Sequence, residues 1–181
     1  MNPAKPFLAA AALAAASLAF AQSGGQDEAR IRSAESAAPA AVGGGATIVA
    51  MNADGTIRVL RRGSNGFTCM PDNPATPGPD PMCMDANAQR WVEAWVGHKP
   101  PPEDNVGLMY MLGGGTDASN VDPFADRPQP GNEWVSTGPH LMIVGAPSLL
   151  RAYPGEAKPD TTRPYVMWAG TPYAHLMVPV R

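Results

Sequence analysis

The chain has 181 residues, of which 44% are hydrophobic and 16% are charged, and its formal net charge at pH 7 is −3. This length suits one domain with a single hydrophobic core. The slightly acidic charge balance excludes a simple electrostatic nucleic-acid binder, which would need a clustered basic face. With 21 prolines and 19 glycines, irregular backbone must be extensive, so we expect a folded domain with long loops.

The first 21 residues have the pattern of a secretory signal peptide. Lys5 supplies a positive charge, residues 7–20 are apolar, and Ala19-Phe20-Ala21 offers the small-x-small pattern that signal peptidase accepts. The apolar run is shorter than the ~20 residues that span a bilayer, and it is mostly alanine. We therefore predict cleavage after Ala21 and a periplasmic or secreted protein with no stable membrane span.

Residues 22–45 precede a single domain that we expect over residues 46–181. Asp27 is predicted to cap a short helix over residues 28–38, because alanine and arginine are good helix formers. The apolar face of this helix is thin, and three glycines follow it. We interpret residues 22–45 as a loosely docked helix or a flexible segment.

Alternation and hairpin spacing predict a small α+β domain with a largely antiparallel sheet, one main helix and long Pro/Gly-rich loops. A hairpin is expected around the turn at residues 52–55. The helix is expected where Trp91 and Trp95, four residues apart, form an aromatic face that Gly97 ends. The predicted strands are near residues 46–52, 56–61, 106–112, 140–145, 165–169 and 174–179, and the helix is near 85–97.

The two cysteines of the chain, Cys69 and Cys83, enclose a segment that contains five prolines. Such a segment cannot form a helix or a central strand. In an oxidising compartment an even number of cysteines favours pairing, so we predict a structural Cys69–Cys83 disulfide. Closing a loop of about 15 residues is worth roughly 3 kcal/mol, and less here because prolines already stiffen the unfolded chain.

The alternative is that sulfur-containing side chains bind copper and do not have structural roles alone. The chain has ten methionines, and thioethers are soft ligands that select Cu(I). Residues two apart share a strand face, so His140 can point with Met142, and His175 with Met177. If the two strands are neighbours, these four side chains could hold copper. Against this, methionines are usually core fillers, and buried histidines usually have only a hydrogen-bond partner.

Aromatic residues mark a candidate groove for a small molecule. Tyr110, Trp168 and Tyr173 lie in or beside predicted strands, and apolar clefts with few polar groups are the usual ligand sites. The sequence has no serine nucleophile elbow, zinc signature or paired-carboxylate motif. Catalytic residues therefore remain unassigned, and we expect no cofactor other than copper in the alternative interpretation.

Four blocks of the chain carry a resemblance: NGFTCMPDNP…DPMCMD, GGTDASNVDPFA, GPHLMIV and YVMWAGTPYAHLMVPV. They resemble those of an uncharacterised family of small exported bacterial proteins, over nearly all of the chain after the signal peptide. The resemblance implies a bacterial, periplasmic protein and supplies no catalytic residue. The first hypothesis for function is a non-enzymatic envelope protein that binds a small molecule or a partner protein. The alternatives are a periplasmic copper-handling protein and a hydrolase of envelope material.

Overall fold

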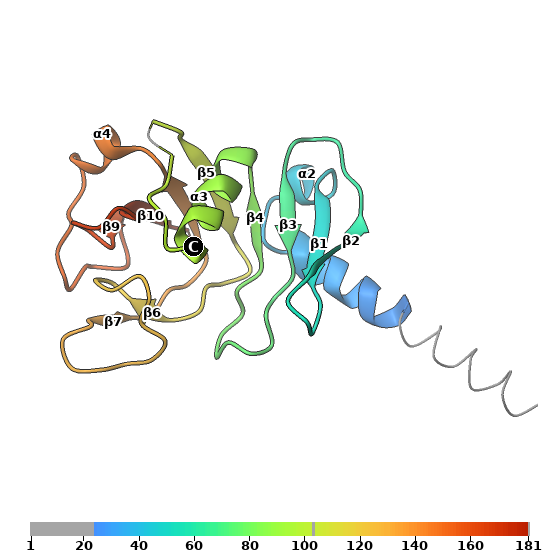
Figure 1. The fold of residues 1–181 in the computed structure, drawn as a ribbon, viewed down its shortest axis with the longest axis horizontal. Coiled ribbons are helices and arrows are strands. Elements are labelled where there is room, and N and C mark those ends of the chain that lie inside the picture. Colours follow the sequence, from blue (N-terminus) through green and yellow to red (C-terminus); the bar gives the residue numbers. More distant parts are fainter. Residues whose placement is uncertain (1–23, 103, 181) are drawn as a thin grey trace, which may run out of the picture.

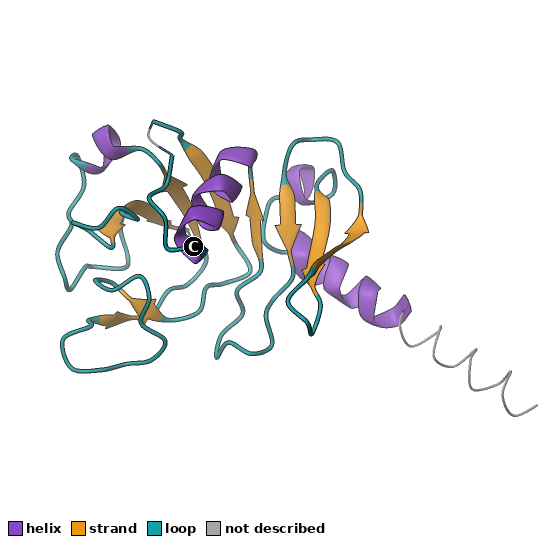
Figure 2. Ribbon diagram, in the orientation of Figure 1, coloured by secondary structure: helices purple, strands orange, loops and turns teal. Residues whose placement is uncertain are grey.

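The structure, a computed structural model, describes residues 24–102 and 104–180. The predicted signal peptide and its cleavage point lie outside the described residues. Within these residues, ten strands form one eight-stranded sheet and a separate two-stranded ribbon, with short helices packed beside them (Figures 1 and 2). The prediction of an α+β fold with a largely antiparallel sheet is confirmed.

The large sheet has the strand order β2-β1-β3-β4-β5-β8-β10-β9. Its strands are β1 (Thr47–Met51), β2 (Ile57–Arg61), β3 (Thr68–Met70), β4 (Met82–Met84), β5 (Gly107–Met111), β8 (His140–Val144), β9 (Tyr165–Met167) and β10 (His175–Pro179). Strands β1 and β3 run parallel, and the other neighbours are antiparallel. The ribbon pairs β6 (Ala118–Ser119) with β7 (Trp134–Val135).

All six predicted strands are present, and each of their ends lies within two residues of the prediction. Strands β3 and β4 were not predicted. They are three residues long and flank the proline-rich segment, where Cys69 and Cys83 are direct cross-strand partners. The two cysteines form a disulfide, which confirms the predicted pairing. Both are fully buried, so the disulfide is part of the core as well as the closure of a loop.

The main helix, α3 (Ala86–Val96), packs on β4 and β5. Asp85 caps it, because its carboxylate accepts hydrogen bonds from Ala88 N at 2.8 Å and from Leu108 N at 3.0 Å. One side chain thus joins the start of the helix to β5. Gly107 permits the close approach, since a Cβ there would lie 2.3 Å from Ala88 N. A short helix, α4 (Pro147–Leu150), follows β8.

A helix over residues 24–35 and the short α2 (Ala40–Gly43) cover the other end of the sheet (Figure 1). Asp27 lies inside this helix and does not cap it, because residues 24–26 are already helical. Its carboxylate instead accepts hydrogen bonds from Arg58 on β2, and this interaction lowers the pKa of Asp27. The helix is therefore fixed to the sheet by an ion pair.

Two hydrophobic clusters lie on opposite faces of the sheet. Strand alternation places Cys83 and its register partner Tyr110 on one face, and Met84 and its partner Met109 on the other. The first face carries a cluster of alanines, Ile48 and the disulfide beneath the N-terminal helix. The second face carries methionines and aromatic side chains beneath α3. Among the described helices, none combines the length and apolar character that crossing a bilayer would require.

Candidate functional site

A row of thioethers crosses the second face of the sheet. Successive register pairs join Met84, Met109, Met142, Met177 and Tyr165, one residue from each of β4, β5, β8, β10 and β9. All five side chains are buried. Directly opposed residues on neighbouring strands have Cβ atoms about 4.5–5.5 Å apart, so these side chains stand side by side across the sheet. The two strand histidines flank this row on either side.

His140 begins β8 and is nearly buried. Its Nδ1 lies 2.6 Å from the carbonyl oxygen of Gly138. Because a carbonyl only accepts hydrogen bonds, Nδ1 carries the proton and Nε2 carries the lone pair. Burial lowers the pKa of His140, so the ring is neutral near pH 7. The ring fits because residue 115 is glycine: a Cβ there would lie 2.7 Å from His140 Cε1.

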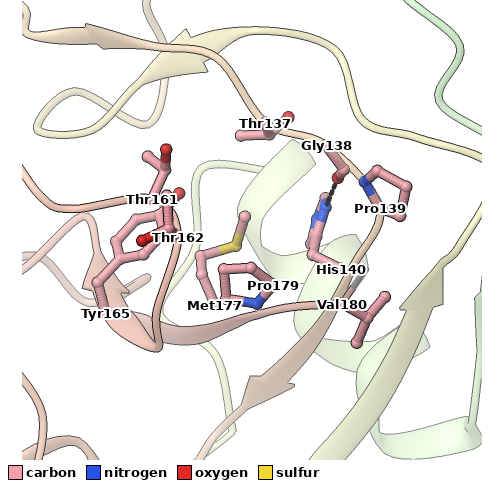
Figure 3. Close-up of a pocket in the computed structure, with 10 residues that line it drawn as sticks. All are labelled: Thr137, Gly138, Pro139, His140, Thr161, Thr162, Tyr165, Met177, Pro179 and Val180. Carbon is pink, nitrogen blue, oxygen red and sulfur yellow. Dashed lines mark hydrogen bonds between the residues drawn. The ribbon is translucent and has the colours of Figure 1, made fainter.

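His140 lines a cavity of about 190 Å³, which we call the His140 cavity. Figure 3 shows the Met177 side chain standing between His140 and Tyr165, with threonine hydroxyls at the edge. Gly138, Pro139, Pro179 and Val180 complete the wall. The six side chains that give the cavity its chemistry are those of His140, Tyr165, Met177, Thr137, Thr161 and Thr162.

Tyr165 gives the His140 cavity a hydroxyl that stays protonated. Burial raises the pKa of Tyr165 to about 12. The wall on this side is held in place by Asp160, whose carboxylate accepts hydrogen bonds from both the amide and the hydroxyl of Thr162. Across the cavity, the hydroxyl of Thr137 donates to the Thr116 carbonyl. The cavity is therefore mainly apolar with a few polar groups, and none of its ten lining residues, all within the described part of the chain, carries a formal charge.

His175 begins β10 and is 1% exposed. Its Nδ1 lies 2.9 Å from the carbonyl oxygen of Tyr173, so this nitrogen carries the proton. Burial, with a smaller contribution from His140, lowers the pKa of His175 to about 4. The remaining nitrogen, Nε2, is buried and has no hydrogen-bond partner among the described residues. A neutral imidazole thus keeps a lone pair inside the protein.

Two tryptophans pack around the His175 ring. The ring centroids of Trp91 and Trp168 lie 5.3 and 4.8 Å from that of His175, and both indoles stand nearly perpendicular to the imidazole. The indoles are parallel to each other, with centroids 6.2 Å apart. Trp168 has a φ of 56°, which is costly for a bulky residue. Its amide donates to Asn120 O and its indole Nε1 to Ser119 O, each at 2.8 Å.

The register places the four predicted copper ligands on two neighbouring strands, with the two histidines on opposite sides of the paired methionines. Met142 and Met177 are direct partners, whereas His140 faces Pro179, four residues along β10 from His175. At about 3.3 Å per residue, the two histidines begin roughly 13 Å apart along the strands. Side chains stand roughly perpendicular to a sheet, and His140 still contributes to the lowered pKa of His175. His140 lies at the cavity, and His175 lies below the tryptophans.

His175 has a neighbour that the sequence interpretation missed. Its direct cross-strand partner is Met167 on β9, which is buried on the same face. Met167 ends the short strand segment Tyr165-Val166-Met167, but only the pairing of β9 with β10 shows that it lies opposite His175. Met177, two residues after His175, shares this face as predicted. His175 therefore has one methionine beside it and another across from it.

The predicted aromatic groove does not form as one surface. Trp168 and Tyr173 lie together around Trp91, but Tyr110 lies on the opposite face of the sheet. There it packs against Phe67, with ring centroids 6.0 Å apart. The cause is strand alternation: Tyr110 pairs with Cys83, whereas the neighbouring Met109 faces α3.

Among the described residues, no group of three or more histidines, cysteines, aspartates or glutamates is placed to hold a metal ion. Comparison with models of known protein families, with curated proteins and with solved structures finds no match to this chain. Function must therefore be inferred from the geometry around the two histidines.

Proposed function

We propose that the protein is a non-enzymatic binding module that takes a small, neutral molecule in the His140 cavity. The observation that carries this proposal is the cavity itself, where a neutral imidazole and a protonated tyrosine hydroxyl border the same apolar space (Figure 3). Few polar groups on apolar walls are typical of small-molecule sites. The volume of about 190 Å³ is below the 300–1,000 Å³ range of drug-sized ligands, so the ligand is small.

The polar groups of the cavity specify the kind of ligand. His140 has its Nδ1 proton committed to Gly138, so only Nε2 remains, and it can accept a hydrogen bond. The Tyr165 hydroxyl stays protonated, because burial raises its pKa to about 12, and it can donate a hydrogen bond. An isolated charge in this neutral site would lose its hydration without compensation. A neutral alcohol, amide or similar compound, with one donor and one acceptor, fits these groups.

The same lining favours binding over hydrolysis. A hydrolase would need a nucleophile or an activated water, with a carboxylate or second base to orient the histidine. Among the described residues that line the His140 cavity, none is aspartate, glutamate, serine, cysteine or lysine. Of its threonines, Thr137 and Thr162 donate their hydroxyl protons to Thr116 O and to Asp160. His140 is oriented by a backbone carbonyl, which fixes the tautomer but accepts no proton during a reaction.

We further propose that the protein acts outside the cytoplasm, in the bacterial envelope. The leader pattern of residues 1–21 supports this location, as does the resemblance to exported bacterial proteins. The Cys69–Cys83 disulfide is consistent with it, because disulfides persist in oxidising compartments. Cell fractionation of the tagged chain tests the proposal, which is contradicted if the protein remains in the cytoplasm with its leader attached.

A fragment screen by NMR tests the proposed binding function. The probe is a library of neutral fragments with one hydrogen-bond donor and one acceptor, added to protein labelled with ¹⁵N. We expect binding fragments to shift the His140 side-chain resonance and the amide of Val180. Tyr165→Phe removes one hydroxyl, and loss of one hydrogen bond of about 0.5–1.5 kcal/mol should weaken binding roughly 2- to 13-fold.

Tyr153→Phe is the matched control, because Tyr153 is partly buried in a loop and does not line the cavity. It should leave fragment affinity unchanged. The proposal is overturned if no fragment shifts the His140 resonance. It is also overturned if Tyr153→Phe weakens binding as much as Tyr165→Phe.

A further inference from the structure

The unpartnered nitrogen of His175 needs a physical explanation. Buried polar atoms nearly always have a hydrogen-bond partner, and leaving one unpaired costs about 1–3 kcal/mol. The ring packs against Trp91 and Trp168, and its direct cross-strand partner is Met167. The lone pair on Nε2 is therefore available to coordinate a soft metal cation.

Two thioethers accompany that lone pair. Met167 is the direct cross-strand partner of His175, and directly opposed side chains begin about 4.5–5.5 Å apart. Met177 follows two residues later on the same strand face. Both methionines are 3% exposed, and long flexible side chains can turn their sulfur atoms toward a neighbour. One imidazole and two thioethers are a ligand set that selects Cu(I) over hard cations.

We propose that His175, Met167 and Met177 form a buried site for a soft monovalent cation of the Cu(I) class, enclosed by Trp91 and Trp168. This site is separate from the ligand site proposed at the His140 cavity, although Met177 borders both. The cation enters and binds in the monovalent state, so binding involves no oxidation or reduction. Because Met177 lines the His140 cavity (Figure 3), that cavity is the way in for the ion.

The surroundings of His175 suit a single positive charge. The ring is already neutral and Nδ1–H is held by Tyr173 O, so no proton has to leave before Nε2 binds an ion. An ion on Nε2 lies in the imidazole plane, beside indoles that stand at 73° and 78° to that plane with their centroids 5.3 and 4.8 Å from the imidazole centroid. Cation–π attraction of this kind is strongest for tryptophan and grows when water is excluded.

The disulfide leaves this site without internal competition. Thiolates are the strongest soft ligands that a protein offers, and a free Cys69 or Cys83 would draw Cu(I) away. Both are joined in the disulfide on the opposite face of the sheet. The thioethers and imidazoles are therefore the soft ligands that the described chain has left, and only His175 combines a sealed lone pair with adjacent sulfur.

An anaerobic titration with Cu(I) tests this site. Ascorbate keeps the copper reduced and is too weak to open the disulfide, and a competing Cu(I) chelator sets the affinity scale. We expect one ion per chain by native mass spectrometry, quenching of tryptophan fluorescence, and a shift of the His175 Nε2 resonance. Ag(I), a soft ion without redox chemistry under these conditions, should bind at the same site.

Conservative variants locate the ion. Met167→Leu keeps side-chain volume and should cost less than about 1.5 kcal/mol of stability, but it removes one thioether and should weaken Cu(I) binding at least tenfold. Met109→Leu is the matched control, since Met109 is equally buried on the same face but lies on β5, two strands from β10. It should leave the affinity unchanged. His140→Asn should also retain Cu(I), whereas it should abolish fragment binding in the His140 cavity.

Three results would overturn the proposal. The first is a chain that binds no Cu(I) in competition with the chelator. The second is an equal loss of affinity in Met167→Leu and Met109→Leu, which would indicate nonspecific binding to thioethers. The third is loss of Cu(I) in His140→Asn with unchanged binding in Met167→Leu, which would place the ion at the other histidine. Failure of fragment binding alone contradicts only the function proposed for the His140 cavity.

Discussion

Acidification should destabilise the metal-free protein between pH 6.5 and pH 4, and His175 should be the main cause. The pKa of His175 is about 4 in the folded chain, against an ordinary value of 6.5. In that window the His175 ring is protonated in the unfolded chain but stays neutral in the folded chain, so the free energy of unfolding falls as the pH falls. Its contribution is fully present above pH 6.5 and is lost as the pH approaches 4.

The size of this effect follows from the two pKa values. With 1.36 kcal/mol per pKa unit, the full difference is worth about 3 kcal/mol, and about 2 kcal/mol of it is lost by pH 5. His140 adds to the loss, because burial also lowers its pKa. Asp80 opposes it, because burial raises its pKa and the folded chain then gains a proton on acidification. The histidines should dominate, since only their ordinary pKa lies near 6.5.

Urea unfolding followed by circular dichroism at pH 7.5 and pH 5 measures the difference. His175→Asn removes the titrating ring, so the stability of this variant should change by about 2 kcal/mol less between the two pH values. A direct check that needs no variant is NMR titration of the native protein, in which the His175 ring should stay neutral down to about pH 4. A ring that titrates near pH 6.5 in the folded state would refute the reasoning.

Three further outcomes are expected from the packing. Gly107→Ala should destabilise the protein by about 1–3 kcal/mol in urea unfolding, because the added Cβ would lie 2.3 Å from the backbone of α3. Gly138→Ala is the control and should not change stability, because a Cβ added there would have no atom within 4 Å. Replacing both Cys69 and Cys83 by alanine should lower stability by up to about 3 kcal/mol, and an unchanged thermal midpoint would contradict that. Asp85→Ala should cost about 0.5–2 kcal/mol through loss of the helix cap, with a visible loss of amide protection at the start of α3.

Much of the fold could be predicted because local signals agree with it. The alternation in β5 and β8 matches burial on one face residue by residue, and Asp85 and Gly97 bound the helix that the tryptophan spacing indicated. Strands β3 and β4 could not be predicted, because three residues beside a proline-rich segment carry too little alternation. Their pairing is decided by neighbouring strands and by the disulfide, both of which are long-range features.

The candidate sites were predicted only in part, for a related reason. Period-two alternation correctly places His175 and Met177 on one strand face. It cannot reveal the order β5-β8-β10-β9, in which β9 follows β10 at the sheet edge. That order brings Met167 to His175 and separates His175 from His140. Burial of an unpartnered nitrogen likewise depends on Trp91 from a distant helix.

Met177 links the two proposed sites, and this leads to a last prediction. Its side chain borders the His140 cavity and stands two residues from His175, and one thioether cannot both bind an ion and keep its place in the cavity wall. A neutral fragment in the cavity should therefore weaken Cu(I) binding, and by reciprocity Cu(I) should weaken the fragment by the same factor. Paired titrations measure both factors.

Met177→Leu separates this coupling from other causes. Leucine can hold the cavity wall but cannot bind the ion, so the variant should bind fragments with one affinity whether or not Cu(I) is present. Met142→Leu is the control, because Met142 is the register partner of Met177 but does not line the cavity, and coupling should persist in it. Two unequal factors in the native chain would show that the titrations had not reached equilibrium. Equal factors that survive Met177→Leu would contradict the role of this thioether, because the sites would then communicate through the strands themselves.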